Sequence, residues 1–478
     1  MCSLALFPPP LPSGNTTLCE SNNELLSGLN GEDTFQVTGH DVNYIILPFH
    51  HYWHDFLHFG GYHSCHNLWL ACFVESGNTH LLACMCVHHF LLLIDSEDMI
   101  AEFSQVLNWP DCVVRAFAWH PHTDKFAVAL LDDSIKIYNP KSATTPTLKH
   151  RLQRNVAALQ WKPLCASGLA VACQSCILVW HVDPCSLSTR PSSGCAQVLS
   201  HPGHSPVTSI SWSPSGSLLV SASPMDTAMM VWDVAAENCV PLQRVGGGGV
   251  TLLSWSPDGS HVLASTPSAL FRVWETRMWT CERWPCIKGR CQSGCWSPDG
   301  SRLLFSVQGE SVIYALTFTA TPGFGPQAAS VVADLSETTF NAQNGDIVVG
   351  GEIQNLAWDP KGERLAVLLK GRVCSFLFSA VWISLLFRTR TSPIFELLPC
   401  GFVQGESGDE PRLIQFHPNF QQGALLTVCW SSGKISHVPF YFLSARVPHF
   451  GFNGSPLPRP QERFNDFANQ SLYTEMLS

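Results

Sequence analysis

Two stretches of this 478-residue chain are near copies of one another: WSPDGSHVLAST at 255–266 and WSPDGSRLLFSV at 296–307. Each begins with an aromatic residue, one further residue and a proline, and the two starts lie 41 residues apart. Six Trp-x-Pro phrases and one Phe-His-Pro phrase of this kind occur between 117 and 420, and their consecutive aromatics lie 41 to 62 residues apart. This interval predicts an array of similar supersecondary units rather than one irregular domain.

The residues of each phrase predict a strand that ends in a tight turn. Proline cannot donate a hydrogen bond to a neighbouring strand, and Asp, Ser and Gly favour turns, so the chain must leave the sheet there. An apolar run follows, and in five repeats a third run ends near a large aromatic residue 18 to 20 residues after the aromatic of the phrase. Hairpins with small turns repeat in this way, whereas helices do not. The aromatics of the third run are Tyr138, Trp180, Trp232, Trp274 and Tyr314.

A period near 40 to 45 residues is typical of the four-stranded blade of a WD40-type β-propeller. A blade cannot bury both faces alone, so it is stable only when it is stacked against neighbours, and closure into a ring protects the inner strand edges. The sequence therefore predicts an all-β fold, a seven-bladed WD40-type β-propeller at 96–446. An irregular N-terminal region with a Pro-rich start is expected at 1–95, and a disordered C-terminal tail at 447–478.

The aromatic residues of the seven phrases are interpreted as core between blades rather than as ligand contacts. Large aromatic side chains supply most of the buried apolar area in such cores. These seven predicted core residues are Trp119, Trp161, Trp212, Trp255, Trp296, Trp358 and Phe416.

One repeat carries a fuller polar signature, composed of His204, Ser223, Asp226 and Trp232. In WD40 repeats a His, Ser, Asp and Trp of this kind form a buried hydrogen-bonded network. His204 and Asp226 also look like a catalytic pair. We favour a role in bracing one blade, because a buried polar network is tolerated when all of its members are satisfied.

Composition argues against nucleic acid and against metal as ligands. The net charge is −10 with only 27 Lys and Arg, which disfavours binding to a phosphate backbone. Twenty cysteines occur, but no positively charged signal-peptide region is visible, so we expect reduced thiols. Cys173 and Cys176 have CxxC spacing, yet they fall in a predicted turn rather than at a helix start, and no second pair lies at zinc-finger distance. We expect no metal and no cofactor.

Motifs of catalysis and of membrane insertion are missing from the sequence. No Gly-x-Ser-x-Gly, HExxH or phosphate-binding loop occurs, so we expect no enzyme. The longest apolar runs, 81–94 and 373–387, are shorter than the 18 or so residues that span a bilayer, so no membrane span is expected. Residues 35–95 are rich in His and nearly uncharged, and 372–386 are similar in character, so neither segment fits the repeat pattern and both read as atypical or non-coding insertions.

Longer stretches resemble the aladin family of WD-repeat nucleoporins. They include FAWHPHTDKFAVALLDDSIKIYN (117–139), LKHRLQRNVAALQWKPL (148–164) and GRCQSGCWSPDGSRLLFSV (289–307). The resemblance implies a non-catalytic scaffold of the nuclear pore complex that supports nucleocytoplasmic transport. It also implies tethering to the nuclear envelope by a transmembrane nucleoporin of the NDC one type, contacts with other pore proteins and a mitotic association with the spindle pole.

The chain departs from that family pattern at 35–95, at 372–386 and in the C-terminal tail. A WD40 adaptor of another complex, such as a ubiquitin-ligase substrate receptor, is the alternative, because it would carry the same repeats. Such a receptor usually adds a motif such as an F-box, and none is apparent.

Overall fold

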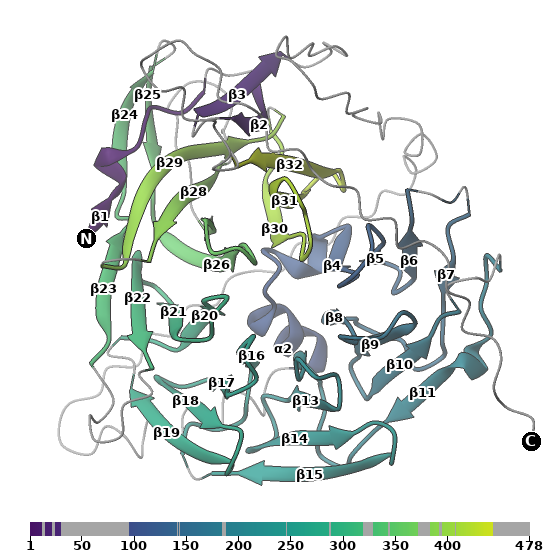
Figure 1. Ribbon diagram of the computed structural model, residues 1–478. Helices are drawn as coiled ribbons and strands as arrows, with labels where there is room; N and C mark the ends of the chain where they lie inside the picture. The colour runs from purple at the N-terminus through teal and green to yellow at the C-terminus, as the bar shows by residue number, and fades with distance from the viewer. Residues whose placement is uncertain are drawn as a thin grey trace, which may run out of the picture. The chain divides into compact units, whose positions relative to one another are not determined.

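The computed structural model describes residues 1–11, 15–21, 24–29 and 95–442, with gaps in the last range at 141, 143, 184–187, 245, 286–287, 319–327, 343–344, 371–382, 392–393 and 407. Within these residues, seven sheets of four or five strands follow one another around a ring (Figure 1). The innermost strand of each sheet contacts the innermost strand of the next, and the last sheet contacts the first. The predicted seven-bladed β-propeller is therefore confirmed.

Blades one to four are each built from four consecutive antiparallel strands, in chain order from the centre of the ring to its rim. Blade one comprises β4 (Val114–Trp119), β5 (Phe126–Leu130), β6 (Ile135–Tyr138) and β7 (Thr147–Leu148). Blade two comprises β8 (Ala158–Trp161), β9 (Gly168–Ala172), β10 (Ile177–His181) and β11 (Ala196–Leu199). Blade three comprises β12 (Ser209–Trp212), β13 (Leu218–Ala222), β14 (Ala228–Asp233) and β15 (Asn238–Gln243). Blade four comprises β16 (Leu252–Trp255), β17 (His261–Ser265), β18 (Leu270–Glu275) and β19 (Thr280–Pro285).

Blade six has the same simple order, whereas segments from elsewhere in the chain join blades five and seven. Blade five comprises β20 (Cys291–Trp296), β21 (Arg302–Val307), β22 (Val312–Thr317), β23 (Ser330–Asp334) and the N-terminal β1 (Cys2–Ser3). A hairpin of β24 (Thr338–Ala342) and β25 (Gly345–Val349) leads to blade six, which comprises β26 (Glu352–Trp358), β27 (Arg364–Lys370), β28 (Ile383–Arg390) and β29 (Glu396–Gln404). Blade seven comprises β30 (Pro411–Phe416), β31 (Gly423–Trp430), β32 (Ile435–Tyr441), β2 (Asn15–Ser21) and β3 (Glu24–Leu29).

The aromatic-x-proline phrases close the innermost strands, as the sequence predicts. In blade four, β16 ends at Trp255, and the Gly259 N–H then donates to the Ser256 carbonyl at 2.9 Å. Gly259 has φ +79°, a conformation that a residue with a Cβ rarely adopts, so glycine suits this turn position. Asp258 accepts from the Ser256 hydroxyl at 2.6 Å, which fixes the turn with side-chain chemistry.

The N-terminal residues are not separate from the propeller, so this part of the predicted boundary at 1–95 is wrong. Strand β2 runs parallel to β32, with Glu20 opposite Phe440, and β3 pairs antiparallel with β2. Strand β1 pairs parallel with β23 in blade five, with Cys2 opposite Ala333. Edge pairing with partners more than 300 residues away leaves no local repeat in the sequence, which is why the pattern did not show it.

Several predictions concern residues outside the described part of the chain. Residues 30–94 and 443–478 are outside it, and with them most of the atypical segment 35–95 and the whole of the tail 447–478. Of the atypical segment 372–386, the structure describes only 383–386, which belong to β28. Leu385, Leu386 and Phe387 are fully buried in that strand.

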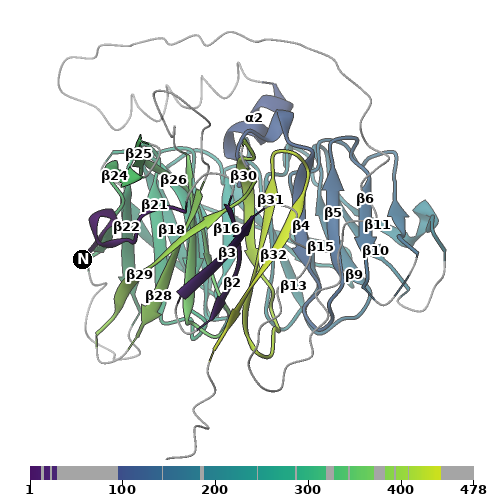
Figure 2. The same ribbon diagram turned by 90° about the horizontal axis from the view of Figure 1, so that it is seen from above.

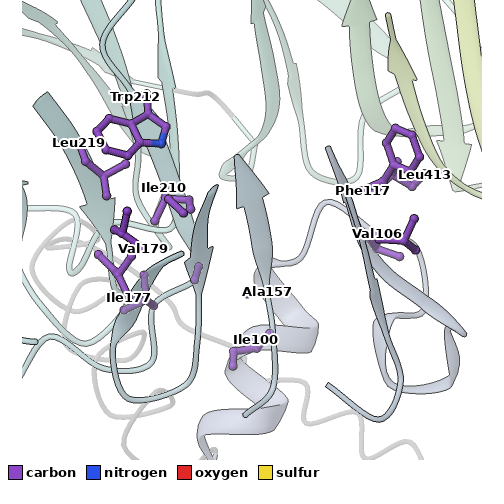
Figure 3. Packing of buried hydrophobic residues seen from close by; sticks show 14 of the residues in the cluster. Ile100, Val106, Phe117, Ala157, Ile177, Val179, Ile210, Trp212, Leu219 and Leu413 are labelled. Atoms are coloured by element: carbon purple, nitrogen blue, oxygen red, sulfur yellow. The ribbon is translucent and has the colours of Figure 1, made fainter. Parts of the chain in front are cut away.

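The residues that precede blade one, 95–113, form a short segment around α2 that lies against one mouth of the ring. Helix α2 (Ser96–Phe103) is capped by Asp95, whose carboxylate accepts from the Glu97 N–H at 2.8 Å. Figure 1 shows α2 at the centre of the ring, and Figure 2 shows it on one side of the blades. Its buried side chain Ile100 belongs to a cluster that also contains Phe117 of blade one and Leu413 of blade seven (Figure 3).

Hydrogen bonds anchor the same segment to blades on opposite sides of the ring. Arg290, just before β20, donates to the Glu102 carboxylate at 2.6 Å and to the Glu102 carbonyl at 2.8 Å. The Leu107 N–H donates to the Arg412 carbonyl of blade seven at 3.0 Å. The Gln174 side chain of blade two donates to the Ser96 hydroxyl. The segment therefore connects the two ends of the repeat array as well as covering the mouth.

Candidate functional site

A continuous network of hydrogen bonds between polar side chains braces blade three, and three of the four predicted residues belong to it. His204 lies in the loop before β12, and its Nδ1 contacts the Asp226 Oδ2 at 2.7 Å. The other ring nitrogen, Nε2, contacts the Ser221 Oγ at 2.8 Å. The Trp232 indole N–H donates to the same Ser221 Oγ at 2.8 Å. This network thus links the loop before β12, strand β13, the turn after β13 and strand β14.

The predicted Ser223 is not the hydroxyl of this network, and Ser221 takes its place. Ser221 lies inside β13, whereas Ser223 follows the last residue of that strand and begins the turn to β14. The Ser223 Oγ instead accepts from the Met225 N–H at 3.4 Å. Both serines are fully buried and stand on the same side of an alternating strand, so the sequence offered both and only the loop geometry selects one.

Burial and hydrogen bonding act in opposite directions on Asp226. Partial burial acts to raise its pKa, but hydrogen bonds from His204 and from the Ala228 N–H at 2.9 Å outweigh that effect. The pKa of Asp226 therefore lies below its ordinary value, and the carboxylate is ionised at neutral pH. An ionised acceptor bonded to a ring nitrogen is a strong hydrogen bond, which suits a brace.

Ser221, His204 and Asp226 have the connectivity of a nucleophile, base and orienting carboxylate. A catalytic triad must also present its hydroxyl to a substrate. The Ser221 hydroxyl is 0% exposed, the His204 side chain is 1% exposed, and the same hydroxyl already accepts the Trp232 indole N–H. A cleft of about 480 Å³ lies between blades five and six, and no member of the network lines it. The arrangement can hold a blade tip in place, but it offers no path for a reacting molecule.

Five of the seven phrase aromatics are buried between blades, and two are only half-buried. The buried ones are Trp119, Trp161, Trp212, Trp296 and Phe416. Trp255 lies against Trp279 with ring centres 6.0 Å apart, and Trp358 lies against Phe395 with ring centres 5.6 Å apart. Both nevertheless pack against buried hydrophobic clusters, so these two positions lie at the margin of the core rather than inside it.

Three of the buried indoles also bond to the preceding blade. Trp161 donates to the Ala118 carbonyl of blade one at 3.1 Å, and Trp296 donates to the Ser254 carbonyl of blade four at 3.0 Å. Trp119 donates to the Thr427 hydroxyl of blade seven at 2.9 Å, across the seam where the ring closes. These aromatics therefore fix the spacing of neighbouring blades by direction as well as by buried area.

Polar side chains on the innermost strands add bonds between blades that the sequence analysis missed. The Ser211 hydroxyl accepts from the Trp255 N–H at 3.1 Å, and the Gln415 amide accepts from the Trp119 N–H at 3.4 Å. The Ser293 hydroxyl accepts from the Leu356 N–H at 3.1 Å. Ser or Gln one to three residues before a phrase aromatic is the available signal, but only the neighbouring blade supplies such a residue with its hydrogen-bond partner.

The described residues offer no group of three His, Cys, Asp or Glu side chains that could hold a metal ion. Over the same residues, no helix combines the length and the apolar character needed to cross a membrane.

Comparison with known proteins places this fold in a family. The family described as the Aladin seven-bladed propeller matches residues 95–441. A protein named Aladin from Arabidopsis thaliana is 31% identical over 379 residues, covering 74% of this chain and 82% of the plant protein. The chain belongs to the aladin family. Its sequence resemblance to that family is therefore confirmed.

A solved structure supports the architecture of this aladin-family chain. The β-propeller domain of Cps50 (Swd1) from Myceliophteria thermophila superposes with a TM-score of 0.50. The superposition covers 68% of this chain and 96% of that domain, and the two sequences are 16% identical. At this identity the likeness shows the propeller fold and nothing further.

Proposed function

We propose that this aladin-family chain is a non-enzymatic scaffold of the nuclear pore complex that supports nucleocytoplasmic transport. Family membership over most of the propeller is the observation that carries the proposal. In this proposal the chain is held at the nuclear envelope by a transmembrane nucleoporin of the NDC one type and associates with the spindle pole in mitosis.

The internal chemistry of the propeller supports a binding role over a catalytic one. The buried network that braces blade three engages all members of its triad-like group, which are Ser221, His204 and Asp226. The segment around α2 covers one mouth of the ring and is tied to blades two, five and seven. What remains for partners is the outer surface and the connecting loops, which is where repeat folds usually bind proteins.

Localisation after depletion of the membrane partner tests the proposal. A fluorescently tagged full chain is followed in cells before and after acute removal of the transmembrane nucleoporin. We expect a nuclear-rim signal that is lost to the cytoplasm on removal. The matched control removes a different membrane protein of the pore and leaves the rim signal in place.

A tagged chain that stays at the rim after removal, or never reaches it in cells with intact pores, contradicts the proposal. Proximity labelling with the same chain separates the alternative. Pore proteins among the labelled neighbours support the scaffold role, whereas ubiquitin-ligase subunits in their place support the adaptor.

A further inference from the structure

The turn that joins β9 to β10 in blade two holds two thiols side by side. The Cys173 N–H donates to the Cys176 carbonyl at 2.9 Å, so the two cysteines are the first and last residues of a tight turn. Residues related in this way in an antiparallel pair have Cα atoms about 5.5 Å apart. That separation lies within the range of about 4.4–6.8 Å that a disulfide bridges.

The Cys173 thiol donates to the Val171 carbonyl at 3.8 Å, and the two thiols lie near enough for each to affect the ionisation of the other. The interaction between the two thiols raises the pKa of Cys173 and lowers that of Cys176, so Cys176 is the thiol that ionises first. The Ser175 hydroxyl acts on Cys176 in the same direction. A thiolate beside a protonated thiol is the pairing that thiol–disulfide chemistry uses.

Neighbouring elements hold the backbone of this turn in one geometry. The Gln174 N–H donates to the Arg154 carbonyl at 2.9 Å, and the Gln174 side chain accepts from Asn155 at 3.2 Å and donates to Ser96 of α2. The Val207 N–H of the next blade donates to the Cys173 carbonyl at 3.4 Å. Both cysteines are therefore held in one turn before any reaction; Cys173 is 0% and Cys176 3% exposed, and Ser175 between them is exposed at the tip of the turn.

Another closely spaced pair of cysteines shows why this geometry matters. Cys291 and Cys295 both lie on β20, where four residues of extended chain separate them by roughly 13 Å. They cannot form a bond with each other. Cys195 is exposed and serves as a reference thiol of a different environment.

We propose that Cys173 and Cys176 form a redox modification site, a dithiol that a small two-electron oxidant such as hydrogen peroxide converts into an intramolecular disulfide. The Cys176 thiolate attacks one peroxide oxygen, the O–O bond breaks, and the hydroxide that leaves takes up a proton to become water. The sulfur of Cys173 then attacks the resulting sulfenic acid of Cys176, the S–S bond forms, and the Cys173 proton leaves with the hydroxyl group as a second water. Two thiols are oxidised and one peroxide is reduced to two waters.

Mass analysis of the full chain tests this site without any substitution. The reduced protein is treated with hydrogen peroxide, remaining thiols are alkylated, and the protein is digested. We expect the peptide that contains Cys173 and Cys176 to lose two hydrogens and both alkylation sites together, and to regain both sites after dithiothreitol. Retention of both alkylated thiols while Cys195 is oxidised would overturn the proposal, as would oxidation of Cys176 to a sulfinic acid without loss of Cys173.

Two variants give the order of the steps. In Cys173→Ser, which keeps the size of the side chain, we expect a Cys176 sulfenic acid that a dimedone probe captures. In Cys176→Ser we expect loss of peroxide reactivity at Cys173, whereas Cys195→Ser leaves the disulfide unchanged. Capture of a sulfenic acid at Cys173 in the Cys176→Ser variant, at the rate seen for Cys176, would contradict the assignment of the attacking thiol.

Discussion

Blade three and blade seven solve the same problem with different parts of the chain. Blade three takes all four strands from 209–243 and is braced by the local chain of His204, Asp226, Ser221 and Trp232. Blade seven takes its inner strands from 411–441 and its outer two from 15–29. There the brace is an ion pair between Glu20 of β2 and Arg364 of the neighbouring blade six.

The ion pair of the second region is the more deeply buried of the two braces. The Glu20 side chain is 0% exposed and that of Arg364 is 3% exposed, and the guanidinium donates to both carboxylate oxygens, one of them at 2.9 Å. The Thr17 hydroxyl of β2 also accepts from the Gln404 N–H of blade six at 3.0 Å. The difference teaches that a local brace stabilises one blade, whereas the N-terminal strands β2 and β3 hold blades six and seven together.

Removing one member of the buried ion pair should have the largest effect. Glu20→Ala leaves the Arg364 guanidinium buried without its carboxylate, so we expect the free energy of unfolding to fall by about 3–5 kcal/mol, measured by urea denaturation. The control is Glu363→Ala, because Glu363 also approaches Arg364, at 3.9 Å, but is 47% exposed. A loss below about 1 kcal/mol is expected for that exposed contact. Equal losses in the two variants would show that blade seven does not depend on its N-terminal brace.

Replacing either of two serines in blade three by alanine should have a smaller effect, and the two replacements together test the local brace. Ser221→Ala leaves the Trp232 indole and a His204 ring nitrogen buried without a partner, so we expect a loss of about 1–3 kcal/mol in the free energy of unfolding. Ser223→Ala is the matched control, since that serine is equally buried and stands outside the network. A larger loss for Ser223→Ala would contradict the assignment of the network.

Acidification should weaken the two regions over different pH windows. Burial lowers the pKa of His437 in β32 to about 4, and His417 nearby acts in the same direction. The unfolded chain takes up this proton near the ordinary value of about 6.5, so stability held by the neutral histidine falls as pH drops from about 6.5 toward 4. The pKa of Asp226 in blade three is lowered instead, so its contribution stays full above the ordinary carboxyl value and is lost only at more acidic pH.

Urea denaturation at pH 7 and at pH 5.5 measures this modest effect. We expect a lower free energy of unfolding at pH 5.5, and a smaller difference in His437→Gln, where the titrating group is gone. An Asp226→Asn variant should keep the full difference between these two pH values. Unchanged stability of the wild type between them would contradict the placement of a neutral histidine in blade seven.

The sequence predicted what repeats within one blade, and it failed where partners are far apart. The phrase Trp255-Ser-Pro-Asp-Gly259 is sufficient to predict a strand end and a turn, because the proline, the carboxylate and the glycine act on their immediate neighbours. The same phrase does not indicate how far neighbouring side chains cover the Trp255 ring, which is only half-buried. Ser221 and Ser223 have equal character in the sequence, and only the folded position of the nearby His204 loop selects Ser221.

The sequence by itself determined the number of blades and where their innermost strands end, because turn chemistry and alternating apolar runs act over fewer than 20 residues and repeat. Its longer stretches also determined the family. Only the tertiary structure decided that β1, β2 and β3 join blades five and seven, that Glu20 pairs with Arg364, and that α2 covers one mouth of the ring. Closure of the ring brings together residues more than 300 positions apart in the sequence. Such contacts stabilise the fold only when neighbouring blades bury them, so no single segment of the sequence can predict them.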